Sequence, residues 1–485
     1  MRKAEITAFL SMVFVLLVSF VLGILEISFI QTSKNLSRLS ADRAVFSVFG
    51  EYHEKLLSDY HIFAIEGSYG TGEFSEEKLT ERMQYYGTGD MKYDVTGIQY
   101  LTDRQGQPFR EQVLQYMEEK YGISIIRDFT GLTTEWKEQA VLGKEMEEKE
   151  KGILEEADSL MENAQIPEKT EENGCSDISE TDGENTEQGN PFTCIEQIEK
   201  SGILSVVMPK DMELSGKKVD LGSQASNRSL NTGRGNFPVR QGTDGLEEKL
   251  LFNEYILNNL SNAVSDPAAQ SSEGVGITSE NNDRSLSYET EYVLEGKASD
   301  KENLESFLMK LLLVRMALNY VYLMGDSEKQ SEAAAFAAAV TTVLLIPEAA
   351  GALKQLVLLA WAAGESIVDI RTLLSGKKAA LVKSSDTWQL PLSSLLTLGS
   401  SNEQIGGEDV PGGVEYKDYL RIFLFLENPD DVNMRLLDRI EENIKTEYGM
   451  DYFKADQCVT KLEADSTSEI LGGITYEFPV YFGYE

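Results

Sequence analysis

Histidine and cysteine are scarce in this chain of 485 residues, which contains two of the former and three of the latter. His53 and His61 have no second metal-binding residue close by in the sequence, and the His-Glu-x-x-His pattern of zinc enzymes is absent. We interpret both as helix-surface residues. The sequence therefore predicts neither a metal site nor a bound cofactor.

The three cysteines exclude a disulfide framework, because an odd and sparse set cannot form one. Cys175 and Cys194 lie in the same polar stretch and close a small loop if the compartment oxidises thiols. The alternative is that both are unpaired residues of a variable linker. Cys458 stands far from them, and no Cys-x-x-Cys spacing occurs.

The common catalytic motifs are also missing: there is no G-x-S-x-G elbow, no P-loop and no dinucleotide fingerprint. Glu365 and Asp369 are four residues apart and share a helix face, which a paired-carboxylate site would require. Such acids on a helix more often meet solvent or a cation, here Arg315 or Arg371. We therefore predict a protein that is not an enzyme.

The adjacent acidic residues near position 430 raise the question of a calcium-binding loop. Asn428, Pro429 and the two aspartates that follow lack the alternately spaced oxygen ligands of an EF-hand loop. Asn followed by Pro and acids is instead typical of a helix start. The sequence predicts an N-cap at Asn428.

Basic residues are outnumbered, with 44 Lys and Arg against 81 Asp and Glu, and the net charge is -37. This charge excludes nucleic acid as a partner, because a polyanion would be repelled. It equally disfavours flat binding to anionic lipid heads. The simplest interpretation is a body that stays soluble outside the cell.

One long apolar run is present, at residues 6–25, without a single charge. A helix of that length spans roughly the 30 Å hydrocarbon layer of a bilayer. Arg2 and Lys3 precede it, so the positive-inside bias places the short N-terminus in the cytoplasm and the rest of the chain outside. The alternative is a cleaved signal peptide, but the run is longer than the usual 7–15 residues and shows no clear cleavage site.

Glu26 ends this run and is its most conspicuous polar residue. A carboxylate in lipid costs a few kcal/mol unless it reaches the interface. Glu26 either extends to water or pairs with a positive group on a neighbouring helix, and both interpretations stay open. It is our candidate helix-packing residue.

The predicted fold class is α+β and mostly helical, with a transmembrane helix that continues without proline into a helical stalk. Apolar residues of the stalk recur mostly at spacings of three and four or their sums and predict one apolar stripe: Leu36, Leu39, Val45, Phe46, Phe49, Leu56 and Leu57. Strands are predicted at residues 93–101, 203–207 and 474–482, and further helices include residues 134–163 and 416–426.

The C-terminal half contains several apolar-rich helices, and residues 333–363 are apolar enough to raise the question of a second span. Pro347, Glu348 and Lys354 interrupt them, so we expect buried core helices. The predicted organisation is a cytoplasmic N-terminus (1–5), transmembrane helix (6–30), stalk (31–61), mixed α+β region (62–163), disordered acidic linker (164–200), short strands and loops (201–300), and helical bundle with a terminal strand (301–485).

The N-terminal residues resemble a known type of protein. Residues 4–11, Ala-Glu-Ile-Thr-Ala-Phe-Leu-Ser, are similar to the G-x-I-T-V-F-L start of pilin-like proteins in Gram-positive tight-adherence (Tad/Flp) systems. Residues 23–26, Gly-Ile-Leu-Glu, resemble the G-I-I-E-F ending of the apolar segment in TadE-like and TadG-like minor pilins. Residues 41–44 stand where those proteins carry an A-A-D-A-A stretch.

The remainder of the chain resembles a membrane family of unknown function, family 5702. The segments that carry this resemblance include residues 40–63, 249–255, 291–297, 361–374 and 416–420. The resemblance implies a single-pass cell-surface protein associated with a Tad-like pilus or secretion system, without a known activity. Its implied partners are the lipid bilayer and other pilus or secretion subunits.

Two residues depart from the pilin pattern. A prepilin peptidase usually cleaves after Gly, and the corresponding residue here is Ala4, which would make Glu5 the first mature residue. Pilins also carry a Glu at the fifth mature position, where this chain has Ala8 or a neighbouring apolar residue. Ala4 and Glu5 therefore mark a candidate processing site, with an uncleaved anchor as the alternative. A membrane-anchored adhesin or sensor unrelated to pili is the second functional hypothesis.

Overall fold

The computed structural model describes residues 2–87, 91–121, 198, 200–209, 213–240, 245–265, 284–343, 349–395, 406–470 and 473–484. Over these residues the fold is mostly helical with one small antiparallel sheet, which confirms the predicted α+β class. The predicted helix at residues 134–163, Cys175, Cys194 and nearly all of the acidic linker lie outside the described residues.

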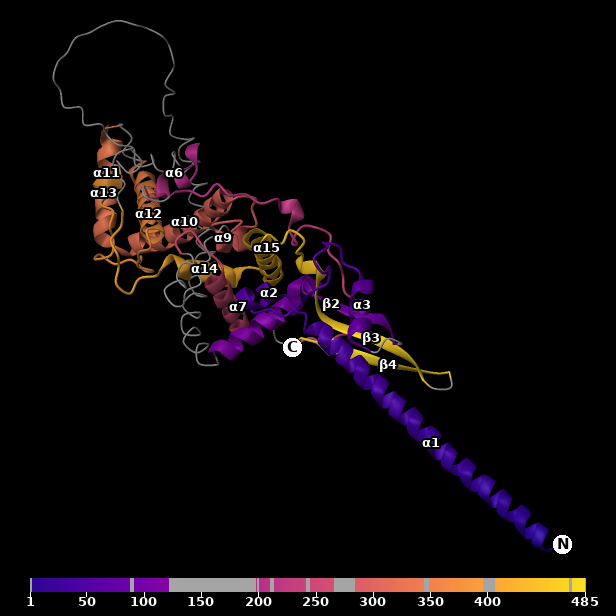
Figure 1. Ribbon diagram of the computed structural model, residues 1–485. Coiled ribbons are helices and arrows are strands. Elements are labelled where there is room, and N and C mark those ends of the chain that lie inside the picture. The colour runs from indigo at the N-terminus through magenta and orange to yellow at the C-terminus, as the bar shows by residue number, and fades with distance from the viewer. Residues whose placement is uncertain are drawn as a thin grey trace.

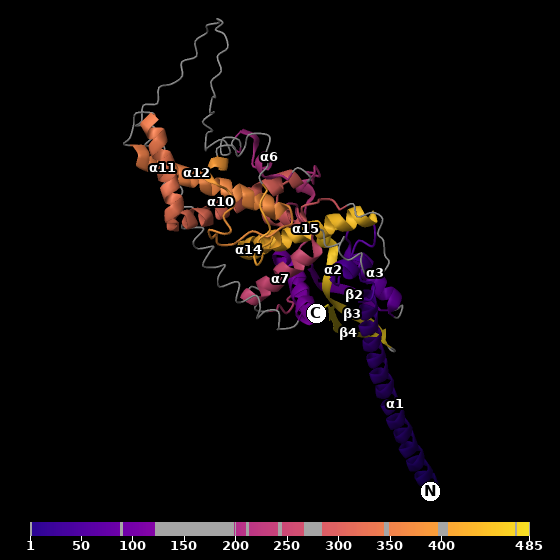
Figure 2. The same ribbon diagram turned by 90° about the vertical axis from the view of Figure 1, so that its left-hand side faces the viewer.

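A single long helix, α1 (Arg2–Phe49), dominates the shape of the molecule. In both ribbon views it projects from the body, and α11 and α12 lie at the opposite end (Figure 1, Figure 2). Its apolar first half is exposed, whereas its last turns are buried against the body. By length and composition the first half can serve as a membrane anchor or as a signal sequence.

The predicted continuous stalk over residues 31–61 is interrupted after Phe49. The chain turns at Gly50, and a second helix, α2 (Glu54–Tyr60), begins at the N-cap His53. Glu51 holds this turn in place because its carboxylate accepts a hydrogen bond from Tyr86 at 2.7 Å and pairs with Arg82. The apolar periodicity of residues 31–60 therefore belongs to two helices that pack in different directions.

The sheet is built around β3 (Cys458–Ile470), which pairs antiparallel with three other strands. β2 (Lys92–Tyr100) lies on one side, and β1 (Ile65–Glu66) and β4 (Ile474–Gly483) share the other. The predicted strands at residues 93–101 and 474–482 are confirmed by β2 and β4. The sequence analysis missed β3.

One face of the sheet packs on the buried turns of α1. The register aligns Val95, Ala464 and Val480 across the three long strands, and all three are buried. They meet Ala44 and Val48 of α1 in one apolar core, to which α3 (Glu76–Tyr86) also contributes. Small residues on α1 allow the helix to lie close to the strands.

A second and larger core lies in the helical part of the body. α10 (Asp300–Gly325), α11 (Ser327–Val343) and α12 (Ala350–Leu374) pack together, and α9 (Glu289–Glu295) lies between α10 and α15 (Pro429–Tyr448). α7 (Leu246–Asn259) and α14 (Tyr416–Leu426) pack on each other beside them. A helix over residues 103–121 joins this core through Phe109 and Val113.

Residues 201–300 contain more helix than the sequence predicted. The expected strand at residues 203–207 is wrong, because this segment forms the short helix α6 (Leu204–Val207). α7 and α9 also fall in the region predicted as short strands and loops. The alternating apolar residues of this region are buried in the helical core rather than in a sheet, since Val206, Val207 and Leu251 all belong to that core.

The question of a second span concerns residues 333–363, and the structure places most of them in α11 and α12. Residues 357–374 of α12 are largely buried within the body, as expected of a core helix. α11 differs from this expectation, because it buries Ala333, Ala337 and Thr341 and leaves much of its remaining surface exposed or half-buried, as are the first turns of α12. Besides α1, α10 is the described helix long and apolar enough to cross a membrane, but Leu308 and Leu311 on its inner face are fully buried in the helical core.

Candidate functional site

The predicted site residues all lie on the projecting helix α1. Ala4 and Glu5 are in its first turn, where the backbone is helical, and Glu26 lies in its middle. The side chains of Glu5 and Glu26 are exposed. The structure therefore places the processing candidate and the packing candidate on one rod about 30 Å apart, at 1.5 Å per residue.

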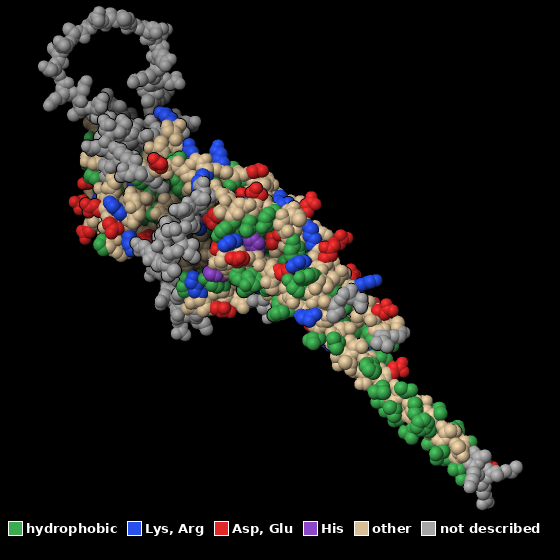
Figure 3. All heavy atoms as spheres, viewed as in Figure 1, with side chains coloured by type: hydrophobic (Ala, Val, Ile, Leu, Met, Phe, Trp, Pro, Cys, Tyr) green, Lys and Arg blue, Asp and Glu red, His purple; other side chains and the backbone are tan. Residues whose placement is uncertain are grey.

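Apolar side chains cover much of the projecting part of α1 (Figure 3), and a few remain exposed beyond the polar residues 31–35. Leu36, Leu39 and Phe46 are 60%, 68% and 65% exposed, although they lie on the half of the helix that reaches the body. Leu36 and Leu39 lie outside the core that α1 forms with the sheet, whereas the Phe46 ring packs edge-on against Phe482 of β4, with the ring centroids 5.6 Å apart. We call Leu36, Leu39 and Phe46 the outer stripe.

Five polar residues, 31–35, separate the outer stripe from the apolar span. The residues of the outer stripe are spaced by three and seven positions, so they lie along one side of the helix. Exposed apolar side chains that form a contiguous patch are typical of a surface that contacts a protein or a membrane. The sequence analysis combined these residues with the sheet-facing ones into one stripe. Distinguishing the exposed residues from the sheet-facing ones requires knowing which face of α1 packs on the sheet.

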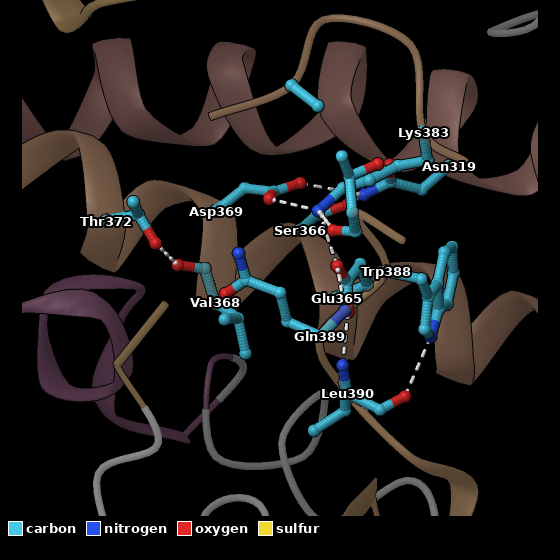
Figure 4. Close-up of polar contacts among 12 residues, drawn as sticks. Asn319, Glu365, Ser366, Val368, Asp369, Thr372, Lys383, Trp388, Gln389 and Leu390 are labelled. Carbon is cyan, nitrogen blue, oxygen red and sulfur yellow. Dashed lines mark hydrogen bonds and ion pairs between the residues drawn. The ribbon is translucent and has the colours of Figure 1, made fainter. Parts of the chain in front are cut away.

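A buried cluster of charges forms the second candidate site, and it contains Glu365 and Asp369. Figure 4 shows the side chains of Glu365, Asp369 and Lys383 converging, with Gln389 and Leu390 on the other side of Glu365 from Lys383. The Lys383 Nζ atom lies 2.5 Å from Glu365 Oε1 and 2.7 Å from Asp369 Oδ1. Arg315 pairs with the other oxygen of Asp369 and donates to the Ala380 carbonyl at 2.8 Å.

This cluster confirms one predicted partner and corrects the other. Asp369 pairs with Arg315, as expected, but Arg371 donates to the Val206 carbonyl at 2.9 Å. Lys383 was not predicted as a member, because it lies in a loop and no helical spacing connects it to Glu365. A lysine in a loop after an acidic core helix carries no signal that could have identified it.

The cluster stabilises the packing of the loop on the helices. Glu365 accepts hydrogen bonds from the backbone of Gln389 and Leu390, at 3.0 and 2.7 Å. The indole nitrogens of Trp361 and Trp388 both donate to the Leu390 carbonyl. Burial raises the pKa of Glu365, and the ammonium of Lys383 opposes that rise.

The charges of the cluster balance, with two carboxylates facing two cations. Arg315 and Glu365 are fully buried, and Asp369 and Lys383 nearly so. Every one of these charges is paired, which is what a stable buried cluster requires. We interpret the cluster as a structural element that fixes the loop on α10 and α12.

The two histidines cap a helix rather than lying on its surface. His53 Nδ1 accepts the hydrogen bond of the Leu56 amide at 3.1 Å, and His61 ends α2 in the left-handed conformation. The His61 ring stacks on Tyr116. Burial lowers the pKa of both imidazoles. Within the described residues, no group of three metal-binding side chains occurs.

The acidic turn at residue 428 is a helix start, as predicted. Asn428 accepts a hydrogen bond from the Asp430 amide at 3.3 Å, and Pro429 begins α15. Asp430 and Asp431 lie in the first turn of α15, where the helix dipole stabilises negative charge. Both acids therefore stabilise the helix.

Among the described residues, the buried carboxyl group of Glu291 forms no ion pair. Glu291 on α9 is fully buried, and its Oε1 atom accepts hydrogen bonds from Tyr416 at 2.7 Å and from the Ala263 amide at 2.9 Å. Its Oε2 atom has no hydrogen-bond partner. Burial raises the pKa of Glu291 to about 7.

Comparison with known proteins identified one family. The model of a family of unknown function, DUF5702, matches residues 181–470. The matched segment includes the helical core and β3, and leaves out α1 and β2. No curated protein and no solved structure matches the chain.

Proposed function

The chain belongs to the family of unknown function DUF5702, and from that premise we propose that it is a non-enzymatic, single-pass surface protein acting as a pseudopilin-like or assembly component of a Tad-like pilus or secretion system. The helix α1 would hold it in the cell membrane, with the N-terminus in the cytoplasm and the body outside. The partners would be lipid and other subunits of the system.

The architecture of α1 is the observation that carries this proposal. One unbroken helix combines an exposed apolar half, long enough for a bilayer, with a half that packs on a sheet. Such a helix can hold the body at the membrane and also present a surface to a neighbouring helix. The outer stripe supports the second role because its exposed apolar side chains lie beyond the span, where lipid does not cover them.

The state of the N-terminus tests the anchor. We expect intact mass and N-terminal sequencing of protein recovered from membranes to give a start at Met1, because Ala4 stands in place of the glycine that a prepilin peptidase usually requires. A start at Glu5 would instead identify a processed pseudopilin. A start beyond Glu26 would show a secreted protein and would exclude the anchor.

The outer stripe tests the role in assembly. We expect Leu39→Asp to abolish photo-cross-linking from a benzoylphenylalanine placed at Leu36, and to reduce pilus assembly or secretion at least about tenfold, because a charge would enter a helix–helix contact. The measurements are cross-linked products on immunoblots and the amount of surface pilus or secreted protein in living cells.

Gln31→Asp is the matched control for this experiment. Gln31 is exposed on the same helix and lies about 80° around the axis from Leu39, at 100° per residue. It should leave cross-linking and assembly unchanged. Normal assembly in the Leu39→Asp strain, or in a strain that lacks the gene, would exclude the assembly role.

A membrane-anchored adhesin or sensor is the second candidate function. The large helical core at the end of the molecule opposite to α1 favours it, because that core is the part of the body held farthest from the membrane (Figure 1). A genomic neighbourhood without genes for a secretion ATPase and a prepilin peptidase would favour this candidate over the first.

A further inference from the structure

A polar cavity of about 420 Å³ lies in the helical part of the body, away from α1. It is bounded by the end of α7 and the segment that follows, by the turn after α12, and by the first residues of α14. The polar side chains that line it belong to Asn258, Asn262, Ser265, Lys377, Glu415 and Lys417. Leu257 and Val264 add an apolar wall.

Two lysines of this cavity, Lys377 and Lys417, donate to neutral oxygens. The Lys417 ammonium donates to the Asn258 side-chain oxygen at 3.4 Å, which is long for a hydrogen bond from a charged group. The Lys377 ammonium donates to the Gly407 carbonyl at 3.2 Å. Within the described part of the chain, neither ammonium forms an ion pair.

The acids near Lys417 are already paired with other cations. Arg421 binds Glu254 and also Asp418, the latter at 2.5 Å. Glu415 lies on the cavity wall, but its carboxylate pairs with Lys378 at 2.8 Å. Among these groups, the four cations Arg421, Lys377, Lys378 and Lys417 face the three acids Glu254, Glu415 and Asp418, which leaves one positive charge in excess, within a protein whose net charge is -37.

Lys417 is the less accessible of the two. Its side chain is half-buried, and burial lowers its pKa. Burying an ammonium group without a strong hydrogen-bond partner costs free energy. A ligand that places an anionic oxygen beside Lys417 would offset this cost with a charge-assisted hydrogen bond.

We propose that this cavity binds a small organic anion that carries a carboxylate or phosphate group. The anionic oxygens contact the ammonium groups of Lys377 and Lys417. The carbon skeleton lies against Leu257 and Val264, which is why an organic acid or phosphate ester fits better than a bare inorganic ion. This site does not involve α1 and is independent of the role proposed for it.

Isothermal titration of the full-length protein in nonionic detergent tests the proposal, with D-glucuronate, glucose 6-phosphate and neutral glucose as probes. We expect saturable binding of at least one of the two anions and none of glucose. The anion that binds tells whether the group is a carboxylate or a phosphate. Absence of saturable binding for both anions up to about 10 mM would overturn the proposal.

Three variants locate the binding. Lys417→Gln and Lys377→Gln should each weaken binding at least about tenfold, because each removes a charge-assisted contact. Lys301→Gln is the matched control, since Lys301 is an exposed lysine on α10 that does not line the cavity. Equal weakening by Lys301→Gln, or unchanged binding in both cavity variants, would contradict the proposal.

A fourth variant tests the assignment of charges directly. Lys378 does not line the cavity but holds the Glu415 carboxylate. Lys378→Gln should release that carboxylate to neutralise the cavity lysines, and so weaken binding by several-fold. Circular dichroism melting curves would establish that all four variants are folded. Unchanged affinity in a folded Lys378→Gln protein would show that Glu415 and the two lysines are not linked as proposed.

Discussion

The Asp369→Asn variant is expected to lose about 3–5 kcal/mol of the free energy of unfolding. Asp369 is the only acid of the buried cluster that contacts both Arg315 and Lys383. Asparagine has nearly the same shape, so the loss would come from charge and not from a cavity. The fully buried guanidinium of Arg315 would keep its carbonyl partners but lose its counter-charge.

Urea unfolding followed by tryptophan fluorescence measures this loss, since Trp361 and Trp388 lie beside the cluster and report on its environment. Lys378→Gln is the control, because it breaks an ion pair whose side chains are 43% and 52% exposed. Such a surface pair contributes about 0–1 kcal/mol. If Asp369→Asn costs no more than this control, the cluster does not stabilise the loop as the geometry indicates.

The Glu291→Gln variant is expected to be more stable than the natural protein above neutral pH. The pKa of Glu291 is about 7 in the folded protein, and its ordinary value is 4.5. The folded state therefore holds a proton that the unfolded state releases. The cost of ionising this buried group grows as the pH rises from 4.5 to about 7, and it stays constant above that.

The size of the effect follows from the difference in pKa. At 1.36 kcal/mol for each pKa unit, glutamine should stabilise the protein by up to about 3 kcal/mol at pH 8, and should change little at pH 4.5. Its oxygen can accept both hydrogen bonds that reach Oε1, from Tyr416 and Ala263. Its amide would replace the Oε2 atom, which has no partner.

Urea unfolding at pH 5 and pH 8 provides the comparison. Glu289→Gln is the matched control on the same helix, because Glu289 is also fully buried but pairs with Arg284 and accepts from Ser261 at 3.0 Å. That variant should lose stability at pH 8. A Glu291→Gln protein that is equally stabilised at both pH values, or destabilised at pH 8, would show that Glu291 does not hold a proton near neutral pH.

Local patterns in the sequence were sufficient to predict most of the helices. The apolar spacing of residues 416–426 and the cap at Asn428 agree with α14 and α15, because a cap and a buried face are both encoded within a few residues. The break at Gly50 was not predicted, since it depends on Glu51 meeting Arg82 and Tyr86 more than thirty residues away.

Long-range pairing explains what the sequence analysis missed. The second half of β3 is an unbroken polar run, Asp-Ser-Thr-Ser-Glu at residues 465–469, and therefore lacks the apolar alternation of a half-buried strand. β3 becomes the central strand because β2 and β4 supply partners on either side. The sequence did not indicate the cavity lysines either. Their excess charge arises because Arg421 and Lys378 form ion pairs with the neighbouring acids, and sequence spacing does not specify these pairs.

β3 pairs with β1 and β2, and β4 packs on α1, so the last strands of the chain complete a core that begins near the N-terminus. This arrangement determines when that core can form during synthesis. Ala44 and Val48 on α1 leave the ribosome about 400 residues before the strands that cover them, so their contacts have a very high sequence separation. Until residues 458–483 are translated, the core between α1 and the sheet lacks its central strand. The growing chain must therefore remain without this core during most of its synthesis.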